Sequence, residues 1–461
     1  MVSGLRPVIV GAGPAGIRAA ERLVAAGLRP TVVDEAARWG GQIYRQPPDG
    51  GFTRPKSALY GFEAGKADAV HQAMAAIRDR VDYKPRTLAW NCEDRALDLL
   101  GDGVSETLPF SHLILATGAT DRVLPFPGWT LPGVFTLGGS QVALKFQGCA
   151  VGRRVAFLGT GPLLYLVAYQ YLKAGVAVAG VFDTAPFDGQ LRAAPGMLRD
   201  PATLAKGLLF VGWLRAHGVP IHNNVRPLRA EGTERVEALV WSRNGREERT
   251  VCDAVAFGLN LRSETQLADL AGCRFRFNEM DRAWLPERDA AGRSSVPGVY
   301  IAGDGGGIAG ADAAELGGER AALALLEDAG LPVEADRVAV LDRRLARVAA
   351  FRRALSAAFP FPEDWASSIA DDTMVCRCEG VSAGTLRAVA TSGQAREINR
   401  AKALTRAGMG RCQGRMCGAA TTELLARALN AGPGDVGRLR AQPPIKPLPV
   451  AAGRPSDEAA S

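Results

Sequence analysis

The sequence predicts an α/β chain in which two strand–glycine turn–helix–strand units precede a small helical C-terminal domain. Three observations lead to this fold class. An apolar run precedes GAGPAG near the N-terminus, a second apolar run precedes GTGPLL, and four cysteines gather between positions 376 and 417. Glycine turns that join a buried strand to a helix are typical of parallel α/β domains. At 461 residues the chain has room for about three domains.

Composition and charge exclude several classes of protein. The net charge of +7 is spread along the chain, without a dense basic block, and predicts no nucleic-acid partner. The opening MVSGLRPVIVGAG has no signal-peptide pattern, and Gln170 and Lys173 interrupt the most apolar window, 157–182, so we expect no membrane span. These features predict a cytoplasmic protein, in which clustered cysteines indicate metal or redox chemistry more often than disulfides.

The first unit, PVIVGAGPAGIRAAERLVAAGLRPTVVDE at 7–35, carries a complete dinucleotide fingerprint. Its first glycine permits a tight turn, the second admits a pyrophosphate, and the third lets helix and strand pack closely. The helix N-terminus offers free N–H groups to the phosphates. The predicted binding residues of the turn are Gly11, Gly13, Pro14, Ala15 and Gly16.

Acidic residues end the second strand of this unit. A carboxylate there can bind ribose hydroxyls, and both Asp34 and Glu35 are candidates. Strand alternation points neighbours to opposite sides, and we favour Glu35. A lone G-x-G-x-x-G could be a structural turn, but the full strand–turn–helix–strand context favours dinucleotide binding.

Three later segments extend the pattern. Trp39-Gly40-Gly41-Gln42 follows the acidic pair, HLILATGAT spans 112–120, and VYIAGDGGG spans 299–307. In this order the segments resemble the two-dinucleotide-domain flavoproteins, which include glutathione reductase and thioredoxin reductase, over about residues 5–330. The resemblance implies a glutathione-reductase-like fold that binds FAD, with Asp304 at its ribityl or pyrophosphate part. The further FAD-binding residues that it implies are Gly41, Gln42, Thr117, Gly118 and Gly303.

One departure argues against disulfide reduction. Disulfide reductases of this family carry a redox cysteine pair, whereas GGQIYRQPPDGG at 40–51 contains no cysteine. The remaining cysteines, Cys92, Cys149, Cys252 and Cys273, are single and far apart, and we interpret them as buried or inert thiols.

The second unit, 153–183, repeats the plan with a degraded fingerprint. Gly159 and Gly161 keep two of the three glycines, and Leu164 stands at the third position. A leucine there pushes helix and strand apart and weakens pyrophosphate docking. In the parent family this domain binds NAD(P)H. Here NAD(P), another adenine nucleotide or no nucleotide at all remain open.

The C-terminal cysteines form the pattern C-x-C, 33 residues, C-x4-C. The intervening segment predicts two short helices that can bring the two pairs together. Zinc sites usually separate paired cysteines by two to four residues, which a C-x-C pair fits poorly, whereas a two-iron cluster tolerates other spacings. We therefore favour a 2Fe–2S cluster over zinc. The predicted metal ligands are Cys376, Cys378, Cys412 and Cys417.

This segment resembles the 2Fe–2S domain of bacterioferritin-associated ferredoxin, although that domain usually closes with C-x-x-C. The stretch TRAGMGRCQGRMCG at 405–418 resembles a more specific group. These are the larger flavoprotein subunits of heteromeric bacterial dehydrogenases: octopine and nopaline oxidase, D-hydroxyproline dehydrogenase, dye-linked proline dehydrogenase and hydrogen cyanide synthase. The resemblance implies a smaller flavoprotein partner, the beta subunit, that oxidises an amino-acid or opine C–N bond, and an electron acceptor. It makes FMN at a subunit interface, and a small third subunit, further candidates.

These interpretations divide the chain into segments. The predicted boundaries are 1–150 and 271–330 for the two parts of the FAD domain, 151–270 for the NAD(P)-binding-like domain, 331–372 for a helical linker, 373–430 for the cluster domain and 431–461 for an extended tail.

Three functions follow as hypotheses. The leading one, which the resemblance to the larger dehydrogenase subunits implies, is an electron-transfer subunit. It agrees with the histidines, since none of His71, His112, His217 and His222 lies in a recognisable acid–base arrangement. The second is a stand-alone NAD(P)H-dependent FAD/2Fe–2S reductase. The third is a catalytically silent scaffold that binds adenine nucleotide and a structural metal.

Overall fold

The computed structural model describes residues 4–450, which divide into two compact units. The first unit combines residues up to 119 with 262–349 and the chain from 440, and the second combines 120–261 with 350–439. The sequence predicts boundaries at 150 and 270, on either side of the part that contains the second glycine turn. Spatial contacts instead divide the chain near 120 and 261, at the short strands β8 (Ala119–Asp121) and β17 (Leu261–Ser263).

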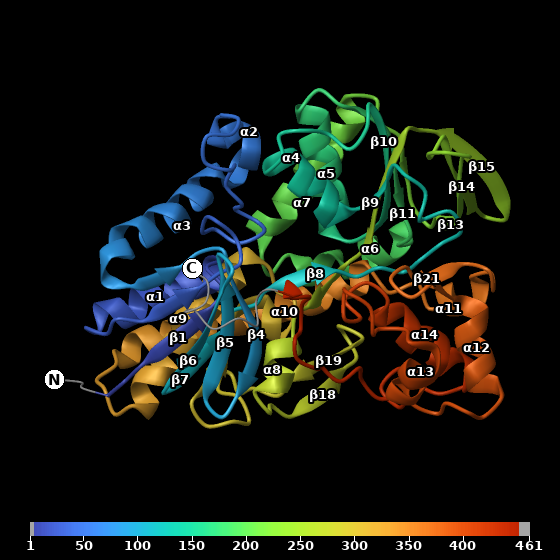
Figure 1. Ribbon diagram of the computed structural model, residues 1–461. Helices are drawn as coiled ribbons and strands as arrows, with labels where there is room; N and C mark the ends of the chain where they lie inside the picture. Colours follow the sequence, from blue (N-terminus) through green and yellow to red (C-terminus); the bar gives the residue numbers. More distant parts are fainter. Residues whose placement is uncertain (1–3, 451–461) are drawn as a thin grey trace. The chain divides into compact units, whose positions relative to one another are not determined.

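A five-stranded parallel sheet of order β20-β7-β1-β2-β3 forms the centre of the first unit (Figure 1). Its strands alternate between two cores. Ile9 joins the core shared with the helices, whereas Val8 and Val10 join the core on the opposite face. The sheet comprises β1 (Pro7–Val10), β2 (Thr31–Val33), β3 (Asp82–Lys84), β7 (His112–Leu115) and β20 (Val299–Ile301).

Helices cover one face of this sheet and an antiparallel meander covers the other. The main helices are α1 (Pro14–Ala25), α3 (Ala64–Ile77) and α9 (Ala311–Asp328), and the meander consists of β4 (Thr87–Glu93), β5 (Ala96–Gly101) and β6 (Val104–Pro109). Smaller elements are α2 (Lys56–Tyr60), α8 (Gln266–Leu270), β18 (Phe275–Asn278), β19 (Ala283–Pro286) and the 3₁₀ turns η1 (Gly61–Glu63), η2 (Arg78–Arg80) and η3 (Gly303–Gly306).

The second unit repeats this layering around a parallel sheet of order β12-β11-β10-β16-β9. Its strands are β9 (Val134–Thr136), β10 (Arg154–Thr160), β11 (Ala177–Asp183), β12 (Ile221–His222) and β16 (Ala254–Leu259). On one face lie α4 (Leu137–Lys145), α5 (Pro162–Lys173) and α7 (Pro201–Ala216), and on the other the meander β13 (Arg226–Glu231), β14 (Ala238–Arg243) and β15 (Arg246–Val251). Helix α6 (Phe187–Met197) follows β11.

A helical C-terminal part completes the second unit (Figure 1). Helix α10 (Ala335–Ala358) carries the chain from one unit to the other. The following elements are α11 (Trp365–Ser368), β21 (Met374–Cys376), β22 (Val381–Ser382), α12 (Ala383–Thr391), α13 (Ile398–Thr405) and α14 (Gly418–Ala428). The two helices predicted between the cysteine pairs are confirmed as α12 and α13.

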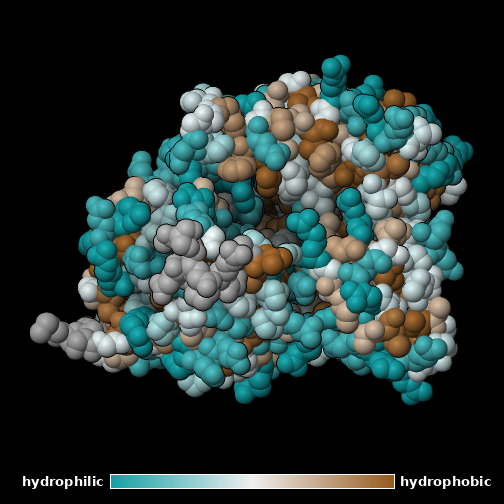
Figure 2. Space-filling view, in the orientation of Figure 1, coloured by the Kyte–Doolittle hydropathy of each residue, from teal (hydrophilic) through white to brown (hydrophobic). Residues whose placement is uncertain are grey.

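The surface offers no helix for membrane insertion. Within residues 4–450, every helix is too short or too polar to cross a bilayer. On the face shown in Figure 2, apolar side chains occur in small groups among hydrophilic ones.

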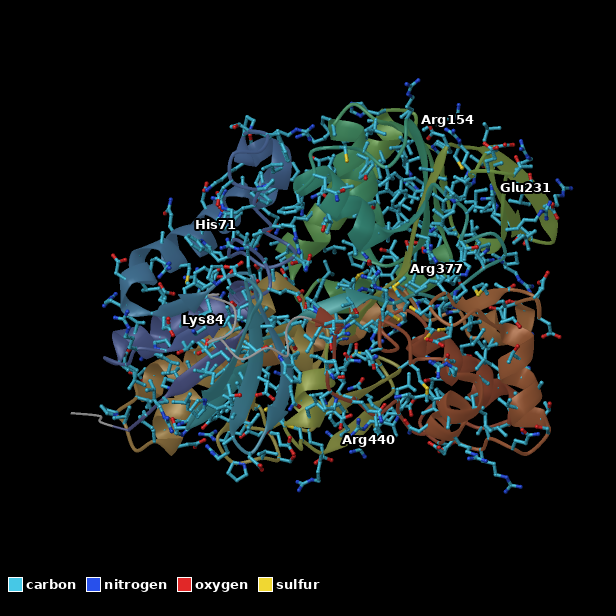
Figure 3. All side chains as sticks on the ribbon, viewed as in Figure 1. His71, Lys84, Arg154, Glu231, Arg377 and Arg440 are labelled. Atoms are coloured by element: carbon cyan, nitrogen blue, oxygen red, sulfur yellow. The ribbon has the colours of Figure 1, made fainter. Side chains whose placement is uncertain are left out.

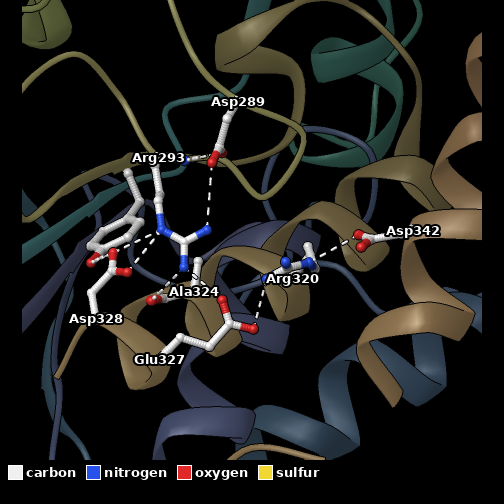
Figure 4. Close-up of polar contacts among 8 residues, drawn as sticks. Asp289, Arg293, Arg320, Ala324, Glu327, Asp328 and Asp342 are labelled. Carbon is white, nitrogen blue, oxygen red and sulfur yellow. Dashed lines mark hydrogen bonds and ion pairs between the residues drawn. The ribbon is translucent and has the colours of Figure 1, made fainter. Parts of the chain in front are cut away.

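An arginine network ties the loop before β20 to helix α9 (Figure 4). Arg293 donates to Asp328 at 2.9 Å and to Glu327 at 2.6 Å, and Tyr300 donates its hydroxyl to the same Asp328 at 2.8 Å. Burial would lower the pKa of Arg293, but the carboxylates of Glu327 and Asp328 outweigh it and raise that pKa. Arg320, on the same helix, extends the network through its own ion pairs.

Replacing Arg293 by methionine leaves Asp328 without its cation and Glu327 with the more distant Arg320 at 3.6 Å. We expect the free energy of unfolding to fall by about 1–3 kcal/mol, the usual cost of hydrogen bonds to charged groups. The change is measured by thermal denaturation. Arg274→Met is the control, since Arg274 is 74% exposed where it pairs with Glu287 and should contribute little. Equal effects of the two variants would contradict this assignment.

Candidate cofactor sites

The first glycine turn lies at the carboxyl edge of the parallel sheet in the first unit. Gly11 has φ +106°, and a Cβ there would lie 2.3 Å from the carbonyl oxygen of Ala116. A Cβ on Gly16 would lie 1.8 Å from the carbonyl oxygen of Gly11. Both positions therefore require glycine, and the turn brings the N-terminus of α1, with Pro14 at its first position, to the sheet edge where α/β proteins bind nucleotides.

The other predicted flavin segments gather around this turn. Gly41 has φ +65°, and a Cβ on it would lie 2.9 Å from the Cα atom of Gly13. A Cβ on Gly303 would lie 2.9 Å from the Cβ atom of Ala15. The structure thus brings together segments that are nearly 300 residues apart at a single edge, where glycines let the backbone segments approach one another closely.

Several predicted residues hold the backbone of this edge. Thr117 donates its hydroxyl to the carbonyl oxygen of Glu264 at 2.6 Å, and Gly118 has φ +71°. Asp304 accepts from the backbone N–H groups of Ala309 and Gly310 at 2.8 and 3.1 Å, before α9 begins. These contacts position the loop. Direct contacts of these residues to FAD remain predictions.

Asp34 and Glu35 have different surroundings. The Asp34 carboxylate accepts from the N–H of Ala12 at 2.5 Å and of Ala36 at 2.7 Å, and burial raises its pKa. The Glu35 side chain is 53% exposed. Asp34 is therefore occupied in holding the turn, and Glu35 has the accessible carboxylate that ribose hydroxyls require. The predicted Gln42 accepts a hydrogen bond from Arg45 at 2.8 Å.

The C-terminal tail returns to this site, which no pattern in the sequence predicts. Lys446 forms an ion pair with Glu35. Ile445 is 4% exposed and donates its N–H to the carbonyl oxygen of Trp90 at 3.1 Å, and the Ala441 N–H donates to Asp269 at 2.7 Å. The predicted tail has no helix or strand from 431 to 449, and residues 451–461 of it lie outside the described residues.

Buried side chains fill the space around the second glycine turn. Leu164, at the third fingerprint position, is fully buried in the core under α5. Asp183, at the end of β11, is also fully buried, and its carboxylate accepts from the Tyr165 hydroxyl at 2.6 Å, from Gln190 at 3.1 Å and from the Ala185 N–H at 2.9 Å. Burial raises its pKa to about 6. The Asp183 carboxylate, which would accept hydrogen bonds from a ribose, already accepts them from groups of the protein.

Gly159 and Gly161 keep the turn geometry in this unit. Gly159 has φ +144°, and a Cβ on it would lie 1.8 Å from the carbonyl oxygen of Gly258. Gly161 has φ +94° and precedes α5. The backbone of a nucleotide-binding turn is therefore present, but the surrounding side chains differ from those of the first turn.

The four C-terminal cysteines form a row. Side-chain hydrogen bonds link Cys376 to Cys417, Cys417 to Cys412, and Cys412 to Cys378. The Cys417 thiol lowers the pKa of Cys376 to about 6 and that of Cys412 to about 5, and its own pKa is raised. A Cβ on Gly410 would lie 2.1 Å from the Cβ atom of Cys378, so the two loops meet closely.

As they stand, no three His, Cys, Asp or Glu side chains between residues 4 and 450 are placed to hold a metal ion. A 2Fe–2S cluster requires two thiolates at each of its irons, and the row of four thiols contains two such pairs. The donor set therefore fits a two-iron cluster.

Two arginines lie beside these thiols. The guanidinium of Arg377, which is labelled in Figure 3, lies 5.5 Å from the centre of the Trp129 ring. The Trp129 N–H donates to the carbonyl oxygen of Met374 at 2.7 Å. Arg415 approaches the carbonyl oxygen of Cys412 at 3.5 Å. We expect these cations to offset the negative charge of thiolates that hold a cluster. Trp129 was missed in the sequence because it lies 245 residues from its hydrogen-bond partner.

The remaining cysteines differ in accessibility. Cys92, Cys252 and Cys273 are buried, and burial raises the pKa of Cys92 to about 12 and that of Cys252 to about 11. Their burial agrees with the prediction of buried or inert thiols, and a raised pKa disfavours the reactive thiolate form. Cys149 is exposed, so of the two predicted alternatives, buried or inert, only the second stays open for it, as a prediction.

Comparison with known proteins identifies both parts of the chain. The sequence model of the pyridine nucleotide-disulphide oxidoreductase family matches residues 5–318. The chain belongs to this family. The model of the BFD-like [2Fe-2S] binding domain matches residues 374–427, which contain all four cysteines of the row. The protein is an FAD-dependent oxidoreductase of this family with an added C-terminal iron–sulfur domain.

Relatives resemble the chain over nearly its whole length. The A-type subunit of opine oxidase from Rhizobium meliloti is 37% identical, with 96% of this chain and 86% of the relative covered. Hydrogen cyanide synthase subunit HcnB of Pseudomonas aeruginosa is 34% identical, with 97% and 98% covered. Among solved structures, L-proline dehydrogenase from P. horikoshii matches with a TM-score of 0.73 at 20% identity, covering 98% of this chain and 79% of that chain, which indicates the shared fold.

Removal of the Lys446 charge tests the role of the tail. A carboxylate has acceptor sites on two oxygens, so Lys446 can orient Glu35 and leave one oxygen for ribose. We expect Lys446→Gln to weaken FAD binding about two- to fivefold, the range of an exposed ion pair, and Glu35→Gln to weaken it more. FAD retained per chain after dialysis measures the effect.

The matched control is Arg440→Gln, which removes a tail cation that pairs with Asp269 instead of Glu35. Arg440 is 66% exposed and should leave FAD content unchanged. Unchanged or tighter FAD binding in Lys446→Gln would contradict the proposed role.

Cys417→Ser tests the thiol row, because Cys417 contacts two of the other three cysteines. We expect loss of iron, of acid-labile sulfide and of the iron–sulfur absorption bands, with FAD content retained in the separate first unit. The exposed Cys149→Ser is the control and should keep its iron. Zinc in place of iron in the anaerobically purified wild-type chain would refute the cluster assignment.

Proposed function

We propose that the chain is the electron-transfer flavoprotein subunit of a heteromeric dehydrogenase. A smaller partner flavoprotein oxidises the C–N bond of an amino acid or opine, of the opine, D-hydroxyproline, proline or glycine type. Electrons then pass through this chain to an acceptor. The observation that carries the proposal is the near full-length similarity to proteins named as subunits, those of opine oxidase and of hydrogen cyanide synthase.

The two cofactor sites suit a relay. When bound, FAD exchanges electrons singly or in pairs and a 2Fe–2S cluster exchanges them singly. In the first unit, the glycine turn and the N-terminus of α1 would hold the pyrophosphate, and Glu35 would accept hydrogen bonds from the adenosine ribose. In the second unit, the four thiols would hold the iron atoms, and Arg377 and Arg415 would offset their charge.

Each histidine contacts a backbone carbonyl or an aromatic ring and not an acid–base partner. This supports substrate oxidation on the partner. His71 contacts the carbonyl oxygen of Tyr44 at 2.9 Å, and His217 that of Trp213 at 2.9 Å. His222 stacks on Phe182 with ring centres 5.4 Å apart, and His112 stacks on Tyr300 at 6.4 Å. Burial lowers the pKa of His71, His112 and His222. A general base for amine oxidation is therefore better sought on the partner.

The second nucleotide domain supports a relay over an NAD(P)H-dependent reductase. Its acidic residue, Asp183, already accepts three hydrogen bonds from the protein interior. An NAD ribose would have to displace the Tyr165 hydroxyl. The proposal leaves room for another adenine nucleotide on this domain, for an FMN at the subunit interface and for a small third subunit.

An anaerobic absorption titration tests the proposal. The purified chain is titrated with NADH and then with dithionite, and afterwards with the partner flavoprotein and its substrate. We expect NADH to leave the flavin and cluster bands unchanged, and dithionite or the substrate-loaded partner to bleach them. Rapid bleaching by NADH would favour the reductase alternative, and a chain without chromophores would favour the silent scaffold.

A further inference from the structure

The second unit contains a cavity that has no role in the proposed function. Its volume is about 420 Å³, which is within the usual range for a small-molecule site. Its wall consists largely of aromatic rings, aliphatic side chains and prolines. The residues at the centre of this wall are Leu124, Phe126, Leu158, Phe257, Phe361 and Trp365.

The cavity lies at the carboxyl ends of β10, β11 and β16, on the side of the sheet that faces the meander. Leu158 and Phe257 belong to the core on the meander face of the sheet, whereas Leu164 and the rest of α5 lie on the opposite face. The segment 360–370 closes the cavity, and the Trp365 N–H anchors it by donating to the carbonyl oxygen of Pro125 at 2.8 Å. Gly159 is the residue of the glycine turn that reaches the cavity, and it does so at the rim.

The wall of the cavity continues into the core around the thiol row. Leu124, Leu259, Trp365 and Ile369 line the cavity, and all four pack in one hydrophobic cluster with Cys376 and Cys417. Trp365 is 7% exposed and Ile369 is 6% exposed, so this wall is dry. A molecule in the cavity would therefore contact side chains of the same hydrophobic cluster that buries Cys376 and Cys417.

Two polar groups at the cavity, those of Thr184 and Arg226, are hydrogen-bond donors without a side-chain acceptor among residues 4–450, and Asn224, Asp364 and Ser368 also line it. The buried Thr184 hydroxyl has no hydrogen-bond partner, and Arg226 forms no ion pair with any residue in 4–450. A ligand for these groups must supply acceptor oxygens. A nucleotide would place several phosphate charges against a lining in which, among the described residues, Arg226 is the one cation, whereas an uncharged ring with carbonyl oxygens fits both the donors and the apolar wall.

We propose that this cavity binds a quinone, which serves as the electron acceptor of the chain. The inference rests on the proposed relay function. Thr184 and Arg226 donate to the two carbonyl oxygens of the ring. Reduction of the quinone to the hydroquinone takes two electrons, which a cluster held by the four thiols would supply, and two protons, which would enter from solvent on the side of the exposed Asp364.

Binding of duroquinone, whose fully substituted ring does not add thiols, tests the proposal. The full-length purified chain is titrated by equilibrium dialysis and by quenching of tryptophan fluorescence. We expect saturable binding that Thr184→Val weakens about fivefold, since one neutral hydrogen bond contributes about 1 kcal/mol. Ser368→Phe places a ring at the cavity mouth from an exposed position and should abolish binding.

Thr391→Val makes the same chemical change on an exposed position of α12 and should leave binding unchanged. Thermal denaturation shows whether each variant is folded. Wild-type affinity in both Thr184→Val and Ser368→Phe would overturn the inference. Displacement of duroquinone by ATP or NADH would also overturn it, because the cavity would then be a nucleotide site.

Reoxidation kinetics separate this inference from the proposed function. The dithionite-reduced chain is mixed with duroquinone or with ferricyanide, which needs no pocket. We expect Ser368→Phe to slow reoxidation by duroquinone at least about tenfold, because duroquinone can no longer bind in the cavity. Reoxidation by ferricyanide should be unchanged. Equal loss with both oxidants would place the defect in the relay and overturn the assignment of the cavity.

Discussion

The close contact between helix α1 and the parallel sheet is the constraint on which the first unit depends. It exists because Gly16 has no side chain, and a Cβ there would lie 1.8 Å from the carbonyl oxygen of Gly11. Helix α9 approaches α1 as closely, since a Cβ on Gly318 would lie 2.0 Å from the carbonyl oxygen of Ala15. Any larger residue at these positions would move a helix and with it the N–H groups that face a pyrophosphate.

The two units show how one architecture can keep a fold and change a site. In the first, Asp34 holds the turn and leaves Glu35 exposed. In the second, Leu164 fills the space beside the sheet and Tyr165 takes the Asp183 carboxylate. The sheet order is equivalent in both, so backbone hydrogen bonding and burial maintain the fold independently of the side chains that bind ligand.

The C-terminal cysteines are packed into the core of the second unit. Cys376 and Cys417 are 1% exposed and pack with Trp365 and Leu124, so the thiol row lies against the nucleotide-binding-like domain instead of forming a detached module. Arg377, stacked on Trp129, belongs to the same contact. The same hydrophobic cluster that buries these two cysteines also supplies part of the wall of the cavity.

Local patterns were enough to predict the building blocks of this protein. The two strand–turn–helix–strand repeats, the helices α12 and α13 and the set of four clustered cysteines all followed from patterns within a few dozen residues, because glycine conformation, apolar periodicity and thiol spacing act locally. Three features became visible only in the folded chain: Asp183 is engaged internally, Lys446 returns to Glu35, and segment 360–370 closes a cavity. Each of these depends on burial and hydrogen bonding between segments whose meeting no local pattern encodes.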